Sequence, residues 1–128
     1  MLYSMLMGQE SKKIGDSGEA VACEYLKELG WEIIERNFRS NKGEVDIIAK
    51  DRGLLVFVEV KNYSHRSFYL PSFSIDRNKK ECIIKTAKYY LYKNRISGVN
   101  CRFDAITIYK SFDGRSKTEH FRNAFESR

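Results

Sequence analysis

The chain has 128 residues, 42% of them hydrophobic, so it is long and apolar enough for one domain with a packed core. One proline and eight glycines exclude fibrous and low-complexity character. Its 23 basic and 17 acidic residues give a net charge of +6, which favours a polyanionic partner such as nucleic acid or an acidic membrane surface.

The three cysteines lie far apart and form no C-x-x-C pair, which argues against a disulfide framework or a zinc site. They are expected to be small buried residues of a cytoplasmic protein. Residues 1–10 lack the basic start of a signal peptide, and no stretch approaches the ~18 apolar residues that span a bilayer. We expect a flexible leader over residues 1–11, or an upstream start codon with Met7 the true start, and a single domain over residues 12–128.

The first element is predicted to be a helix over residues 16–29, ended by Gly30. Its apolar stripe runs through Ala22, Leu26 and Leu29, and continuing that stripe backwards places Glu19 on the same side. Two interpretations of Glu19 stay open. It is either a carboxylate turned towards a functional site or a rim residue that suits the positive end of the helix.

The rest of the chain reads as strands interrupted by one further helix. Apolar periodicity and turn residues predict a strand over residues 31–38, a hairpin over 43–61, a helix over 77–95, a strand over 100–110 and an edge strand over 117–125. The order α-β-β-β-α-β-β predicts an α/β domain with a mixed sheet flanked by helices.

The hairpin GEVDIIAKDRGLLVFVEVK, residues 43–61, contains charges among apolar residues. Both faces of its second strand are apolar, so that strand is expected at the centre of the sheet. Counting outward from a two-residue loop places Asp46 opposite Glu59, with Cβ atoms ~5 Å apart. The same register places Glu44 opposite Lys61. Two ionised carboxylates this close repel each other by ~4 kcal/mol at an effective dielectric near 20.

Three arrangements could offset this repulsion: a shared proton that raises one pKa, the nearby cation Lys61, or a divalent metal ion. In the metal interpretation, Asp46, Glu59 and the backbone carbonyl of Val60 bind the ion, which activates water against a phosphodiester. Lys61 then orients the water or stabilises the phosphate, and Glu19 completes the metal shell. The alternative is a structural network of ion pairs, although such pairs stabilise a fold only weakly when buried.

The spacing Asp46-x12-Glu59-x-Lys61 resembles the PD-(D/E)XK nuclease signature. The longer stretch GDSGEAVACEYLKELGWEIIERNFRSNKGEVDIIAKDRGLLVFVEVK resembles the bacterial YraN family, and the resemblance continues through RNKKECIIKTAKYYL and CRFDAITI, spanning residues 12–109. That family has a restriction-endonuclease-like fold similar to archaeal Holliday junction resolvases. The resemblance implies that Glu19, Asp46, Glu59 and Lys61 form a nuclease-like catalytic site.

The resemblance also bears on nucleic-acid contacts. Lys79 matches a lysine of the family pattern, which implies that it approaches a phosphate. Where the family has an arginine two residues beyond its lysine, this chain has Tyr63, which leaves Arg66 as the nearest basic substitute. The family's proline before the second helix is also missing. Lys80 and the other lysines of that helix are either a surface that follows phosphates or the solvated side of an amphipathic helix.

Together these features predict a Mg²⁺- or Mn²⁺-dependent endonuclease acting on DNA rather than RNA, with branched or junction DNA as the substrate. The alternatives are a catalytically silent nucleic-acid-binding module of the same fold and a protein-binding adaptor. By analogy with resolvases, which cut two strands symmetrically, a homodimer is expected. His65 and His120 are expected to be solvated or hydrogen-bonded, and Asp104 either supports the site or pairs with Arg102.

Overall fold

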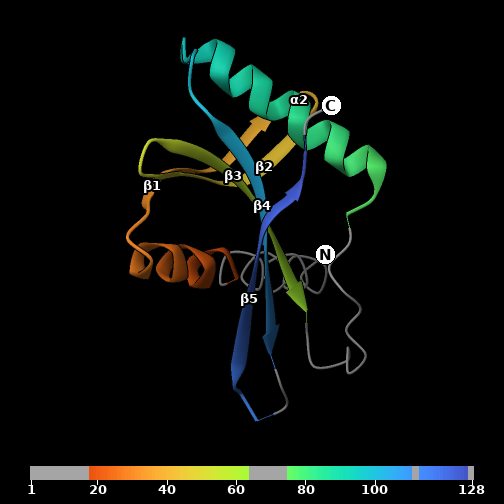
Figure 1. Ribbon diagram of the computed structural model, residues 1–128. Helices are drawn as coiled ribbons and strands as arrows, with labels where there is room; N and C mark the ends of the chain where they lie inside the picture. Colours follow the sequence, from red (N-terminus) through yellow and green to blue (C-terminus); the bar gives the residue numbers. More distant parts are fainter. Residues whose placement is uncertain (1–17, 64–74, 111–112, 127–128) are drawn as a thin grey trace, which may run out of the picture.

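Five segments rich in β-branched and aromatic residues form one mixed sheet, which a helix covers on each face (Figure 1). The computed structural model describes residues 18–63, 75–110 and 113–126. In chain order these form a helix over residues 18–28, β1 (Glu32–Ser40), β2 (Gly43–Asp51), β3 (Leu54–Tyr63), α2 (Arg77–Lys93), β4 (Cys101–Lys110) and β5 (Ser116–Phe125). This order confirms the predicted α/β class. The predicted leader, His65 and Arg66 lie outside the described residues.

The sheet has the order β1-β2-β3-β4-β5, so β3 is central and β5 is an edge strand, as predicted. β3 and β4 are parallel and the other neighbours are antiparallel. Parallel strands need a long crossover, and α2 lies in it. The β2–β3 turn also follows the prediction: Asp51 pairs with Leu54, and the loop residues Arg52 and Gly53 both have positive φ, as a tight hairpin turn requires.

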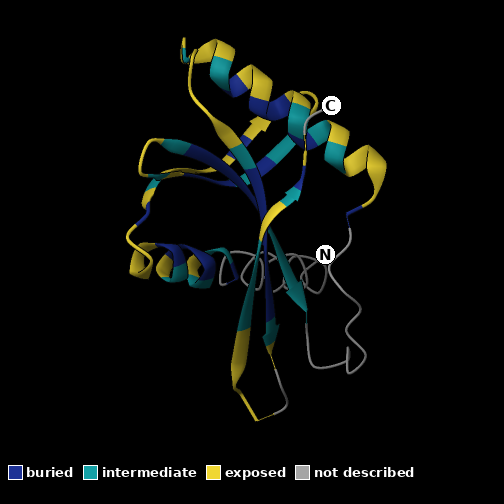
Figure 2. Cartoon of the chain, in the orientation of Figure 1, coloured by how far each residue is buried: buried dark blue, intermediate teal, exposed yellow. Residues whose placement is uncertain are grey.

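Each helix buries one apolar cluster against one face of the sheet. Figure 2 shows the buried residues concentrated on the strands between the two helices. On one face Ala22 and Leu26 pack against β-strand residues that include Ile47, Val56 and Ile106. On the other face α2 contributes the buried residues Ile83, Ala87 and Tyr90, which pack against Phe57 and Phe103. The predicted apolar face of the first helix is thereby confirmed for Ala22 and Leu26. It is wrong for Leu29, which is 42% exposed because the helix ends at residue 28 and Leu29 lies in the following turn.

The ends of α2 follow from local hydrogen bonds. Asp76 caps its start, because the Asp76 carboxylate accepts a bond from the backbone N–H of Lys79 at 2.9 Å. The helix ends at Lys93 rather than at residue 95, since Asn94 already has non-helical backbone angles. β1 extends to Ser40, two residues beyond the predicted end, because it continues to pair with β2 up to Gly43.

The cysteines differ from the prediction. Cys23 is buried, but Cys82 is only partly buried and Cys101 is exposed on β4, so the expectation of three buried residues was wrong. All three are free thiols. Among the described residues, no helix combines the length and apolar character needed to cross a bilayer.

Gly43 allows α2 to pack closely on β2. A Cβ atom at this position would lie 3.1 Å from Cys82 Cβ and 3.3 Å from Thr86 Oγ1. Gly43→Ala is therefore expected to lower the free energy of unfolding by ~1–3 kcal/mol, because the helix must shift or the contact stays strained. Urea denaturation measures this, with Lys50→Ala on the exposed side of the same strand as a control expected within ~0.5 kcal/mol of wild type. Equal stability of both variants would show that α2 can move at no cost.

Candidate active site

β2 and β3 separate at the point where the predicted site begins, and we call this point the β2–β3 fork. Their ladder ends at the pair Ile47 and Val58, so the predicted backbone pairing of Asp46 with Glu59 does not form. Beyond it, β2 pairs only with β1 and β3 only with β4. The carboxylate of Asp46 enters the fork instead, and its Oδ2 accepts a hydrogen bond from the backbone N–H of Val60 at 2.8 Å.

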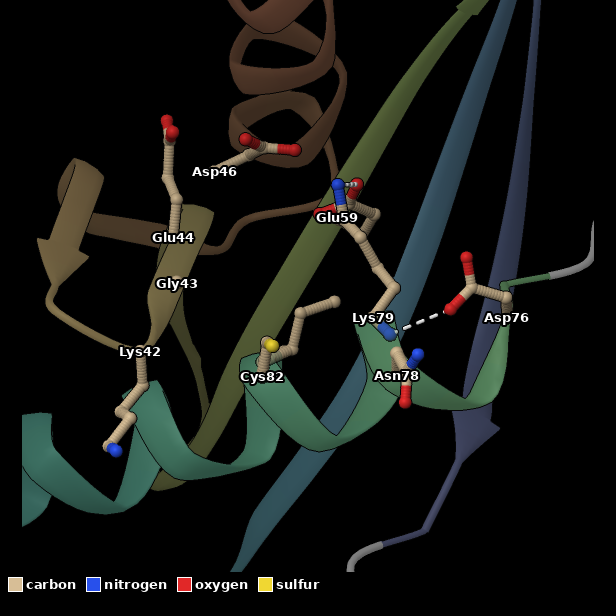
Figure 3. Close-up of a pocket in the computed structure, with 10 residues that line it drawn as sticks. Lys42, Gly43, Glu44, Asp46, Glu59, Asp76, Asn78, Lys79 and Cys82 are labelled. Carbon is tan, nitrogen blue, oxygen red and sulfur yellow. Dashed lines mark hydrogen bonds and ion pairs between the residues drawn. The ribbon is translucent and has the colours of Figure 1, made fainter.

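Asp46 and Glu59 nonetheless meet across the fork, where Figure 3 shows their side chains turned towards one another. Burial, the charge of Glu59 and a hydrogen bond with Glu59 together raise the pKa of Asp46 to about 8, although the bond from Val60 opposes the rise. Glu59 is itself only 5% exposed. Asp46 therefore keeps a proton at neutral pH when no cation is bound, which corresponds to the first of the three predicted ways to offset the repulsion.

The cation beside Glu59 is Lys79 rather than Lys61. Lys79 Nζ lies 3.1 Å from Glu59 Oε1. Partial burial lowers the pKa of Lys79, but the charge of Glu59 and the hydrogen bond to it outweigh this and raise that pKa above its ordinary value. Lys61 lies two residues beyond Glu59 on β3, half-buried and opposite Thr107 of β4. By strand alternation it shares a face with Glu59.

Two further carboxylates approach Asp46 from other parts of the chain. One oxygen each of Glu19, Glu44 and Asp46 lies within 4.8 Å of the other two. Glu44 was expected to face Lys61 but forms an ion pair with Arg39 at 3.4 Å, so that expectation was wrong. Sequence reasoning did not include Glu44 among the metal ligands. The feature of the sequence that could have identified Glu44 as a ligand is its position two residues before Asp46 on the same strand.

A cavity of about 390 Å³ opens between the fork and the first turns of α2 (Figure 3). Its wall combines carboxylates with cations and small apolar groups, namely Lys42, Gly43, Glu44, Asp46, Glu59, Asp76, Asn78, Lys79, Cys82 and Ile83. Among the described residues, Glu19, Lys61 and Lys80 are not part of this wall. A volume in this range accommodates a small ligand group such as a phosphodiester.

The donor set fits a hard divalent cation. Mg²⁺ and Mn²⁺ prefer carboxylate and water oxygens. Opposite oxygen ligands of one Mg²⁺ lie ~4.2 Å apart, twice the usual bond length. The oxygens of Glu19, Glu44 and Asp46 lie within 4.8 Å of one another, so the group is at most slightly wider than one coordination shell. Glu59 lies beside Asp46 as a fourth acid. The role of the Val60 carbonyl as a ligand stays a prediction.

Asp104 belongs to a separate network that faces helix 18–28. Arg102 Nε donates to Asp104 at 2.7 Å. Of the two roles predicted for Asp104, the ion pair with Arg102 is therefore confirmed, and support of the candidate site is not. His120 Nε2 lies 2.7 Å from the same carboxylate, and its other ring nitrogen lies 3.2 Å from the hydroxyl of Tyr25. His120 is thus hydrogen-bonded, as predicted.

Comparison with known proteins agrees with the resemblance to YraN. The model of the uncharacterised protein family UPF0102, which is the YraN family, matches residues 18–108. A UPF0102 protein of Persephonella marina is 46% identical over 112 residues, covering 88% of this chain and 92% of the relative. One from Trichlorobacter lovleyi is 41% identical over 122 residues, covering 94% and 96% of the two chains. The fold, the acidic hairpin and these matches along nearly the whole chain show that the protein belongs to the UPF0102 family.

Proposed function

We propose that this protein is a Mg²⁺- or Mn²⁺-dependent nuclease that hydrolyses phosphodiester bonds in DNA, with branched or junction DNA as its substrate. The observation that carries the proposal is the pairing of the half-buried Asp46 with the buried Glu59 at the β2–β3 fork. Keeping two carboxylates together away from water is costly unless a proton or a cation offsets their repulsion, and a divalent cation held by both would do so. Glu19 and Glu44 bring two more acids to the same place from other elements.

The charged side chains of the site would have two roles: the acids would bind the metal ion, and the lysines would act on the phosphate and the attacking water. Asp46, Glu59, Glu19 and Glu44 would hold the ion, which when bound lowers the pKa of a coordinated water and polarises a phosphoryl oxygen. Lys79 is positioned to stabilise negative charge on a phosphate at the cavity mouth, since it reaches the cavity while 45% exposed. Lys61 would orient the attacking water from the adjacent position on β3.

The distribution of charge supports a nucleic-acid substrate. The segment 77–95, which contains α2, holds seven basic residues and one acidic residue, so its net charge equals the +6 of the whole chain. Lys85 and Lys88 are exposed, and Tyr92 is 81% exposed on the same helix. The first turns of α2 line the cavity, so a nucleic acid bound along this helix would have a phosphate group close to the cavity.

The same charge favours a second candidate, a nucleic-acid-binding module of this fold without turnover. The positive charge of segment 77–95 would bind a polyanion whether or not the carboxylates bind a metal. The three free cysteines support placing either function in the reducing cytoplasm.

The test is to titrate Mg²⁺ and Mn²⁺ by calorimetry into wild type and Asp46→Asn, and to assay both against linear, flapped and four-way DNA and against RNA. Wild type should bind the ion and cleave at least one DNA form. Asp46→Asn should lose both by at least ~100-fold, because even residues that merely support metal ligands cost 10–100-fold. Glu32→Gln, an exposed acid on β1, is the matched control.

Two outcomes would reject the nuclease. Wild type that binds DNA with normal salt dependence but cleaves nothing supports the binding module. Cleavage that survives in Asp46→Asn would place the activity outside the β2–β3 fork.

A further inference from the structure

Two arginines of the edge strand β1 contact the acidic group. Arg36 Nη2 lies 3.6 Å from Glu19 Oε2, and Arg39 Nε lies 3.4 Å from Glu44 Oε2. The arginine side chains are 40% and 74% exposed, whereas those of Glu19 and Glu44 are 13% and 35% exposed. Each of these two carboxylates therefore has a guanidinium group on its solvent side.

The backbone of β1 brings both arginines to one place. Residues three apart on a regular strand point to opposite faces of a sheet. Between Arg36 and Arg39, however, Asn37 has a φ of 54°, in the left-handed region, which breaks the alternation. Both guanidinium groups consequently reach members of one carboxylate group whose oxygens lie within 4.8 Å of each other.

The N–O distances in these two pairs, 3.6 and 3.4 Å, are too long for the pairs to add much to the stability of the fold. Charge-assisted hydrogen bonds to carboxylates are usually ~2.7–2.9 Å long, and exposed ion pairs contribute only ~0–1 kcal/mol. The buried pair of Arg102 and Asp104, at 2.7 and 2.8 Å, shows what a structural pair in this chain looks like. Separating Arg39 from the partly exposed Glu44 should therefore cost little. For the more buried Glu19, a bound cation would replace the charge that Arg36 supplies.

A divalent cation would compete directly with the arginines. An ion held by Glu19, Glu44 and Asp46 draws on the same negative charges that now attract the two guanidinium groups. Arginine binds phosphate in a planar, two-point geometry, and both side chains are exposed enough to reach a phosphate outside the carboxylates. Because the arginines and Lys79 already balance the ionised carboxylates, the ion would thus make the local charge more positive, which favours binding of a phosphodiester.

We propose that Arg36 and Arg39 are exchangeable counter-ions: they neutralise Glu19 and Glu44 until a divalent cation binds there, and the released guanidinium groups then bind phosphate oxygens of the nucleic-acid substrate. The inference rests on the proposed function, because it requires that the carboxylates bind a metal ion and that the substrate is a nucleic acid. It gives metal binding a second effect, which is to create the phosphate-binding groups of the site.

The test measures two affinities that should change in opposite directions. In Arg36→Gln and Arg39→Gln, calorimetry should show Mg²⁺ binding several-fold tighter than in wild type, because a competing cation is gone. Fluorescence anisotropy with a labelled four-way DNA junction, checked by gel to be intact, should show several-fold weaker binding when Mg²⁺ is present. The slope of log affinity against log salt should fall by about 1 for each arginine removed. In EDTA the same variants should bind the junction nearly as wild type does.

Two further variants separate this mechanism from a structural role. Arg115→Gln removes an exposed arginine that pairs with Asp113 at 3.3 Å, far along the chain from the cavity. It should leave the affinities for Mg²⁺ and for the junction near those of wild type. Arg36→Lys and Arg39→Lys keep the charge but lose the two-point geometry. They should keep Mg²⁺ affinity near wild type and recover DNA binding only in part.

The outcomes distinguish the inference from the proposed function. If wild type cleaves DNA but the glutamine variants bind Mg²⁺ no more tightly, or lose DNA affinity equally in EDTA, the exchange is rejected while the nuclease stands. If the affinities change in opposite directions but no substrate is cleaved, the exchange stands and the nuclease is rejected. Wild type that binds no Mg²⁺ overturns both.

Discussion

The metal-free protein is expected to lose stability as the pH rises from about 4 to about 8. An unfolded aspartate releases its proton near pH 3.9, whereas burial beside Glu59 holds that of Asp46 to about pH 8. Between these values the native state binds more protons than the unfolded state, so the free energy of unfolding falls with rising pH and levels off above about 8. Since each pKa unit corresponds to ~1.4 kcal/mol, a rise of about four units corresponds to a loss on the order of 6 kcal/mol.

Asp46→Asn is the variant that isolates this effect. The amide cannot titrate, yet it can still accept from Val60 and donate to Glu59 as the protonated acid does, so its stability should stay nearly level over the same range. Urea denaturation in EDTA at several pH values measures both proteins, with Glu32→Gln as a control that should follow wild type. Adding Mg²⁺ at pH 8 should restore stability to wild type and not to Asp46→Asn. A flat wild-type profile would show that Asp46 is ionised throughout.

Asp104→Ala is expected to lower the free energy of unfolding by ~3–5 kcal/mol at pH 7. The side chain is fully buried, receives two hydrogen bonds from Arg102 and one from the backbone N–H of Asn123, and contacts His120. Removing the carboxylate leaves the guanidinium of Arg102 without its partner at a position where it is only 19% exposed. Guanidinium chloride denaturation at constant m-value checks the loss.

The chain provides a matched control for this change. Asp113 and Arg115 form the same type of pair two residues apart, but both are exposed, so Asp113→Ala should cost no more than ~0.5 kcal/mol. A loss below 1 kcal/mol in Asp104→Ala would mean that the buried network adds nothing beyond an exposed pair.

The stability of the protein at acid pH is a second test of the role of Asp104. Burial alone would raise the pKa of Asp104, but hydrogen bonds with His120, Arg102 and Asn123 lower it to about 2. An acid whose native pKa is lowered contributes stability that is complete above about pH 4 and is lost as the pH falls towards 2. The contribution is ~2–3 kcal/mol, and Asp104→Asn should lack this acid-side decline.

The elements of the fold could be predicted because their signals are local. Alternation and turn residues around Arg52 and Gly53 determine the hairpin and its register next to the loop, and the helical stripe through Ala22 and Leu26 determines which side of the first helix is buried. The same local pattern placed Glu19 on the inner side, where its side chain is 13% exposed.

The register failed only where the strands stop following a regular ladder. A continued ladder would place Asp46 and Glu59 as backbone partners, but their carboxylates cannot both be buried there without a compensating group. The carboxylate of Asp46 takes the N–H of Val60 instead, and the strands separate. Alternation alone carries no signal for such an exchange of a backbone partner for a side chain.

By itself, then, the sequence determined the order of elements, the apolar faces, the hairpin and the acids that it carries. Only the tertiary structure decided which charges meet: Lys79 with Glu59, Arg39 with Glu44 and Arg36 with Glu19. The physical reason is that periodicity reports neighbours along one helix or strand, whereas an ion pair between elements depends on how helices and strands pack. That packing is set by the whole core, down to the space that Gly43 leaves for α2.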